Sequence, residues 1–232
     1  MNSLKSIIQS FAVVSAVICI FGVVGCGKGK PPTRGQKATK LMNSGNKEEQ
    51  IEGIKMAGNL GKEGQYAVSD IMKLLDSSDA DLRAAAVQAL TSLEAEKAGD
   101  KFEELAQTEA DGAVLYELLN GIKTLKGAEA MIAACKPHLS GEGKSKLEAT
   151  NALSFLNAGD PIPVADLVAL AEDSDAGVRA NVATALSKTD PESGDAAAAK
   201  AALKKLAEDK DQTVQTNAQD ALQLLGGTVP AP

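Results

Sequence analysis

Six segments of the chain repeat one pattern of apolar and polar positions. When the segments are aligned, a small or flexible residue recurs at intervals of 31 to 36 residues. Apolar residues stand three positions before it, one after it and four after it in nearly every segment, and this spacing places them on one face of an α-helix. The shared residues, which allow neighbouring helices to pack closely, are Met56, Ala89, Gly121, Ala152, Ala185 and Ala221.

Each of these predicted helices is preceded by a residue of the type that starts a helix. Ten positions before the shared residue stand Asn46, Asp79, Asp111, Asp175 and Asp211, with Glu142 as a weaker cap in the fourth segment. Asn and Asp side chains accept hydrogen bonds from the free N–H groups of the next turn. A short apolar run upstream of the cap predicts a first helix in five of the six segments. In the fourth, Pro137 predicts that this first helix ends early.

Each unit is therefore predicted to be a helix, a turn and a capped second helix. One such pair cannot bury its apolar faces alone, whereas stacked pairs can. We predict an all-α fold, a right-handed α-solenoid of about six helix-turn-helix repeats over residues 39–227, followed by a disordered C-terminal tail over residues 228–232.

Two segments, "DADLRAAAVQALTSL" and "DAGVRANVATALSKT", resemble HEAT repeats, especially the short form named after phycobilisome lyases. Both carry an Asp followed by an aliphatic residue and an Arg, which are Arg83 in the second repeat and Arg179 in the fifth. In that family the Asp and the Arg bridge neighbouring repeats. The resemblance therefore implies a structural role for Arg83 and Arg179, and Gln50, Leu115 and Lys146 replace the Arg in the first, third and fourth repeats.

The N-terminal part of the chain has a different pattern. Residues 1–25 have a basic start and an uncharged apolar run, and Val23, Val24, Gly25 and Cys26 resemble the lipobox of bacterial lipoprotein signal peptides. The resemblance implies that residues 1–25 are removed and that Cys26 carries lipid. An uncleaved membrane helix is the alternative. Residues 22–28 also match the phosphate-binding pattern G-x-x-x-x-G-K, but they lack its Ser or Thr and lead into two prolines.

Charge divides the chain into a basic neck and an acidic body. Six basic residues and no acidic residue lie between Cys26 and Lys47, and residues 26–38 are predicted to be the lipidated Cys and a flexible basic tether. From Glu48 onward there are 17 basic and 31 acidic residues, a net charge of −14. The neck is interpreted either as a contact for anionic headgroups or as a soluble spacer. Gly27 implies, by resemblance, an outer-membrane location facing the periplasm.

The sequence offers few groups for catalysis or for metal binding. His138 is the only histidine, predicted at the surface or in a turn, and Cys135 is predicted to be a small buried residue. Three D-x-D pairs lack the twelve-residue spacing of an EF-hand and are predicted to serve turns and caps. The acidic body and its few aromatic residues also disfavour nucleic-acid binding. We predict no enzyme activity, no metal and no cofactor.

The outward positions of the second helices are the candidate functional surface. In HEAT arrays this helix row lines the concave side, and here it is rich in uncharged polar side chains. We interpret it either as a groove for a protein or peptide, with Phe155 as an anchor, or as a solvated face. The candidate residues are Gln88, Asn120, Asn151, Phe155, Asn181, Thr184, Asn217 and Leu224.

Together these patterns predict a lipid-anchored, non-catalytic scaffold for protein interaction at the bacterial cell envelope, held to the membrane by its lipid. A basic partner would suit the acidic body. The alternative is an accessory or lyase-like factor that presents a ligand or cofactor to another protein, which rests on the resemblance to lyase-type repeats alone.

Overall fold

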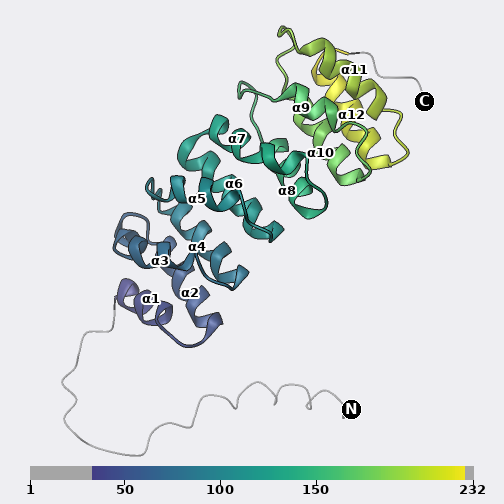
Figure 1. The fold of residues 1–232 in the computed structure, drawn as a ribbon. Coiled ribbons are helices and arrows are strands. Elements are labelled where there is room, and N and C mark those ends of the chain that lie inside the picture. Colours follow the sequence, from purple (N-terminus) through teal and green to yellow (C-terminus); the bar gives the residue numbers. More distant parts are fainter. Residues whose placement is uncertain (1–32, 228–232) are drawn as a thin grey trace, which may run out of the picture. The chain divides into compact units, whose positions relative to one another are not determined.

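The computed structural model describes residues 33–227, and all the regular structure in this range is helical (Figure 1). The elements are α1 (Arg34–Met42), α2 (Lys47–Gly58), the 3-10 helix η1 (Gly61–Ala67), α3 (Val68–Leu74), α4 (Ala80–Ser92), α5 (Ala98–Ala106), α6 (Gly112–Lys126), α7 (Ala128–Leu139), α8 (Lys144–Ser154), α9 (Val164–Ala169), α10 (Ala176–Leu186), α11 (Ala196–Leu206) and α12 (Gln212–Leu224). The predicted all-α solenoid of six helix pairs is confirmed. The predicted signal peptide, the lipobox and the tail over 228–232 lie outside the described residues.

The six second helices form a continuous row, in which α2, α4, α6, α8, α10 and α12 each contact the next. The predicted inward position, one residue after the shared small residue, is fully buried in every repeat. Its occupants are Ala57, Leu90, Ile122, Leu153, Leu186 and Leu222. Burying one Leu or Ile side chain contributes about 1.5–3 kcal/mol. Because one apolar core runs from α1 to the end of α12, each pair is stabilised by its neighbours.

Small residues allow the helices to approach each other at the shared position. A Cβ on Gly58 of α2 would lie 2.9 Å from the Cα of Ala89 on α4. A Cβ on Gly121 of α6 would lie 2.7 Å from the ring of Phe102 and 2.8 Å from Oγ1 of Thr91. The glycine therefore makes room for Phe102, the largest fully buried side chain of the described residues.

Helix α1 begins inside the segment predicted as a tether over residues 26–38. Thr33 is its N-cap: Oγ1 of Thr33 accepts from the N–H of Gln36 at 3.2 Å, and Oε1 of Gln36 accepts from the N–H of Thr33 at 2.9 Å. This reciprocal pair is a capping box. The basic residues that suggested a tether, Arg and Lys, also have a high intrinsic helix propensity, so a basic composition is compatible with this helix.

Two expectations for the fourth repeat are wrong. Pro137 lies inside α7, which continues to Leu139. Pro137 removes one helical hydrogen bond, to the carbonyl of the exposed Ala133, and only the last turn of α7 contains it, so little of the helix is disturbed. The N-cap of α8 is Gly143, with φ of 71°, and not Glu142, because the chain turns through a left-handed conformation that glycine adopts without strain.

Candidate interaction surface

The five short polar residues predicted as caps lie at the N-termini of second helices. Each accepts hydrogen bonds from backbone N–H groups of the first turn, and these contacts fix where the helix starts and which side faces outward. Asn46 accepts from Glu49, Asp79 from Asp81 and Leu82, Asp111 from Val114, Asp175 from Gly177 and Val178, and Asp211 from Thr213 and Val214.

A second side chain, two residues before each of these caps, accepts a hydrogen bond from the N–H of the cap itself. The five residues at this position are Ser44, Ser77, Glu109, Asp173 and Asp209. Two of the three D-x-D pairs, at 173/175 and at 209/211, therefore combine this turn residue with a cap. In the third pair Asp79 is the cap, and Asp81 forms an ion pair with Lys47 at 2.5 Å. Residues 33–227 hold no cluster of three or more metal-ligating side chains.

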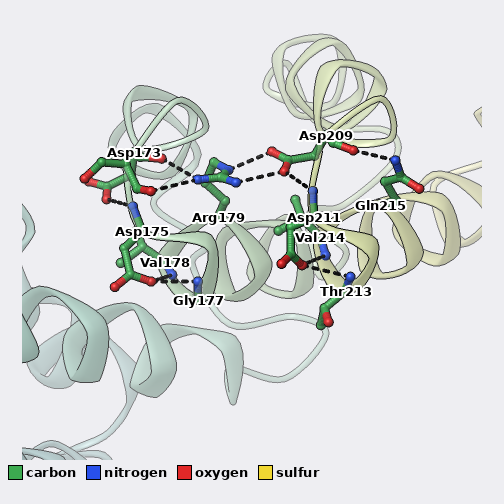
Figure 2. A network of polar contacts seen from close by, with 11 residues as sticks. Asp173, Asp175, Gly177, Val178, Arg179, Asp209, Asp211, Thr213, Val214 and Gln215 are labelled. Atoms are coloured by element: carbon green, nitrogen blue, oxygen red, sulfur yellow. Dashed lines mark hydrogen bonds and ion pairs between the residues drawn. The ribbon is translucent and has the colours of Figure 1, made fainter.

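Arg179 joins the fifth repeat to the sixth through the turn residue Asp209 (Figure 2). Nε and Nη2 of Arg179 donate to the two carboxylate oxygens of Asp209 at 2.6 and 2.8 Å, and Nη1 donates to the carbonyl of Asp173 at 2.7 Å. Only 6% of the Arg179 side chain and 11% of the Asp209 side chain are exposed. The hydrogen bonds from Arg179 lower the pKa of Asp209, although burial opposes this shift.

The same bridge recurs at two other junctions. Arg83 donates to both carboxylate oxygens of Glu109 at 2.9 and 2.8 Å, and Nζ of Lys146 lies 2.8 Å from Asp173. In each case the acidic partner stands two residues before the cap of the next repeat. The sequence pattern predicted a bridging role for Arg83 and Arg179 but did not identify these partners. At the junction of the third and fourth repeats the basic position holds the fully buried Leu115.

The polar candidates of the C-terminal half are engaged in helix packing. Nδ2 of Asn181 lies 3.3 Å from Oγ1 of Thr150 and 3.4 Å from the carbonyl of Leu147, so it joins α10 to α8. Nδ2 of Asn217 reaches Oγ1 of Thr184 at 3.2 Å and a carbonyl of α10 at 3.3 Å, so it joins α12 to α10. These side chains are half-buried, and their polar groups are largely satisfied within the array.

An aromatic pair, made of the half-buried Tyr116 and the exposed Phe155, lies on α6 and at the end of α8. Phe155, the C-cap of α8, is 56% exposed, and its ring meets that of Tyr116 edge-on with centroids 6.4 Å apart. Such a pair prefers this geometry. The Phe155 carbonyl accepts from Nζ of Lys123 at 2.6 Å, while the next residue, Leu156, is buried. The sequence pattern does not single out Tyr116, because its place beside Phe155 follows only from the packing of α6 against α8.

The other candidates surround this pair or lie at the end of the row. Gln88 donates to Glu117 at 2.7 Å, and Asn151 lies 3.4 Å from Glu148. Asn120 is half-buried on α6. Leu224 is 68% exposed at the end of α12, and Figure 1 shows α12 at the other end of the row from α2, beyond α8 and α10.

His138 and Cys135 are both buried in the interior of the array. His138 is buried, which corrects the expectation of a surface or turn residue, and its Nε2 lies 2.7 Å from the carbonyl of Ala106 at the end of α5. Because a carbonyl only accepts, Nε2 donates and joins α7 to α5. Burial raises the pKa of Cys135 to about 12, so its thiol stays protonated and unreactive at neutral pH.

Between residues 33 and 227, no helix combines the length and the apolar character needed to cross a bilayer.

Comparison with known proteins supports the fold. The family model described as HEAT repeats matches residues 36–123 and 137–223. An engineered protein is 23% identical, with a TM-score of 0.52, and the match covers 86% of this chain and 100% of that one. The Escherichia coli protein YibA is 15% identical, with a TM-score of 0.60, over 80% of this chain and 68% of that one. A designed armadillo repeat protein in complex with the peptide (KR)4 is 19% identical, with a TM-score of 0.52, over 82% and 98%. No curated protein matches the sequence.

Proposed function

The chain belongs to the HEAT-repeat family, and on that premise we propose that it is a non-catalytic, lipid-anchored scaffold that binds a protein or peptide at the bacterial cell envelope. The observation that carries the binding role is the Tyr116–Phe155 pair. A large aromatic side chain that is more than half exposed contributes little to the core. Aromatic residues of this kind are frequent binding anchors, because they bury a large area with little loss of conformational entropy.

Charge around the pair favours a basic partner. Glu117 and Glu148 lie on the same helices as Tyr116 and Phe155, and the chain from residue 48 onward carries a net charge of −14. Long-range attraction of this kind raises the rate of association with a positively charged partner. The designed armadillo repeat protein that shares the fold is described with the basic peptide (KR)4, which is consistent with such a partner.

The anchor rests on the sequence around Cys26. The lipobox-like residues Val23, Val24 and Gly25 precede it, and residues 1–25 have the charge and apolar pattern of a secretory signal. A lipid on Cys26 would hold the solenoid at the membrane surface of the envelope, where its partner must also be present.

The binding role is tested by isolating the tagged full chain from its native envelope and measuring its affinity for the protein that accompanies it. Phe155→Ala should weaken binding about thirtyfold or more, as expected when a hot-spot anchor is truncated. Leu224→Ala, which removes an exposed apolar side chain elsewhere on the row, is the matched control and should have a small effect.

Two further measurements complete this test. Phe155→Ala should change the free energy of unfolding by under about 1 kcal/mol, whereas Leu156→Ala should cost about 2–5 kcal/mol through lost burial and a cavity. Unchanged affinity of the Phe155→Ala variant would reject the aromatic pair as the binding site. A bound chromophore or metal in place of a protein would favour a ligand-presenting accessory factor.

The anchor is tested separately by mass spectrometry of the native chain. We expect acyl mass on Cys26, loss of residues 1–25, and an unprocessed precursor in the Cys26→Ser variant. A mature chain with an unmodified Cys26 would contradict the lipid anchor.

A further inference from the structure

The outward face of α1 is basic and largely unpaired. Arg34, Lys37 and Lys40 are all exposed, and α1 contains no acidic residue. Lys37 lies 3.6 Å from Glu52, but both side chains are more than half exposed, so the pair is weak. Among residues 33–227, no carboxylate lies within 4.0 Å of Arg34 or Lys40. We call Arg34, Lys37 and Lys40 the basic face.

A cavity of about 780 Å³ opens beside the basic face and is lined by Arg34, Lys40 and Tyr66 among others. Tyr66 is 49% exposed, and its hydroxyl donates to the carbonyl of Gly35 at 2.8 Å, which holds the ring against α1. Among the residues that the structure describes, Glu63 is the one carboxylate in this lining. Cations beside an exposed tyrosine are typical of a surface that meets lipid headgroups.

The position of α1 in the chain brings this face close to a membrane. Helix α1 lies at one end of the row of helix pairs (Figure 1), and Arg34 follows Cys26 by eight residues. Eight residues span at most about 29 Å when fully extended. If Cys26 carries lipid, as proposed above, Arg34, where the basic face begins, cannot move farther than this from Cys26.

We propose that the basic face docks on anionic phospholipid headgroups and, with Tyr66 at headgroup level, sets the orientation of the solenoid on the membrane. This inference rests on the proposed lipid anchor. Three cations at an anionic surface favour the docked orientation on the order of 100-fold. The acidic repeats that follow are repelled by the same surface, so the α1 end faces the bilayer and Phe155 stays open to a partner.

The test uses the native lipidated chain reconstituted into two kinds of vesicle, one of phosphatidylcholine alone and one that also contains phosphatidylglycerol. Lysine acetylation rates are read by mass spectrometry. Lys37 and Lys40 should react several-fold more slowly on the anionic vesicles, and about 1 M salt should remove this protection because it shortens the screening length to roughly 3 Å. The exposed Lys136 and Lys204, on α7 and α11, are the controls and should react equally in both.

A variant carrying Arg34→Gln, Lys37→Gln and Lys40→Gln tests orientation. Energy transfer from a dye at the C-terminus to lipid dyes should be low for the wild type on anionic vesicles and should rise in the variant. A Lys136→Gln and Lys204→Gln variant is the matched control and should behave as wild type. Equal labelling of Lys37 and Lys40 on both vesicles would overturn the docking proposal while leaving the anchor intact. Absence of acyl mass on Cys26 would overturn both.

Discussion

The bridge between Arg179 and Asp209 can be tested with residues that the chain itself uses at the same positions. In the first repeat Gln50 stands at the Arg179 position and donates to the carbonyl of Ser44 at 2.8 Å. In the second, Ser77 stands at the Asp209 position and accepts from the N–H of its cap at 3.2 Å. The variants Arg179→Gln and Asp209→Ser therefore remove the ion pair and keep the local hydrogen bonds.

Each single substitution should lower the free energy of unfolding by more than the net contribution of the ion pair itself. Arg179→Gln leaves the mostly buried carboxylate of Asp209 without its cation, and Asp209→Ser leaves the guanidinium without its anion. Removing one partner of a buried pair costs about 3 kcal/mol or more. The double variant removes both charges and should cost at most about 3 kcal/mol in total, so the coupling energy is at least about 3 kcal/mol.

The assay must resolve single repeats, because repeat arrays can unfold in parts. Amide hydrogen exchange measured in α11 and α12 reports on the sixth repeat, and exchange in α4 serves as the internal reference. Each single variant should accelerate amide exchange in α11 and α12 and leave exchange in α4 unchanged. In the double variant, exchange in α11 and α12 should be slower than the sum of the two single free-energy changes predicts. Effects that add within about 0.5 kcal/mol would refute the reasoning, since they would mean that the two charges do not interact.

Two other predictions concern stability. The pKa of Asp209 is held below its ordinary value of 3.8 by Arg179, with burial opposing, so the bridge stabilises the fold above about pH 4 and this contribution is lost as the pH falls through the lower folded pKa. Urea unfolding from about pH 7 to about pH 2 should therefore show a steeper loss for wild type than for Asp209→Ser. Thr189→Val should raise the free energy of unfolding by about 1 kcal/mol and the melting temperature by about 2–4 °C, because the buried Thr189 hydroxyl has no partner among the described residues. A lower melting temperature would show that the hydroxyl is satisfied in solution.

The fold could be predicted because its signals are local and are repeated six times. The spacing of apolar residues identified the inward face of each second helix, and short polar residues marked where those helices begin. The failures came where one repeat departs from the others. Pro137 is tolerated because it lies near the end of α7, and Gly143 caps α8 because the turn there requires a positive φ. The helix and cap preferences of single residue types do not contain this positional information.

The acidic partners of the bridges were missed, although the sequence contains a signal for them. A basic residue at the position of Arg83, Lys146 or Arg179 is followed in the next repeat by an acid two residues before the cap position. Where that basic position holds Gln50 or Leu115, the next repeat has Ser77 or Ser140 there. Comparing the basic position of each repeat with the residue two before the cap of the next repeat would have revealed this series of bridges. The contacts of His138 and Tyr116 carry no such signal, because they depend on how separate helices pack.

The bridge pattern also bears on the position of the proposed binding surface. The junction of the third and fourth repeats has Leu115 in place of a basic residue, and the helix that follows, α8, has no side-chain cap. Tyr116 and Phe155 lie across this same junction. Natural sequences depart from local consistency mainly at functional sites. The junction of the first and second repeats, with Gln50 and Ser77, also lacks the bridge, but its second helices keep their side-chain caps. Only at the junction beside Tyr116 and Phe155 are the bridge and the cap of the second helix both missing among the described repeats, which supports the position of the candidate surface independently of exposure.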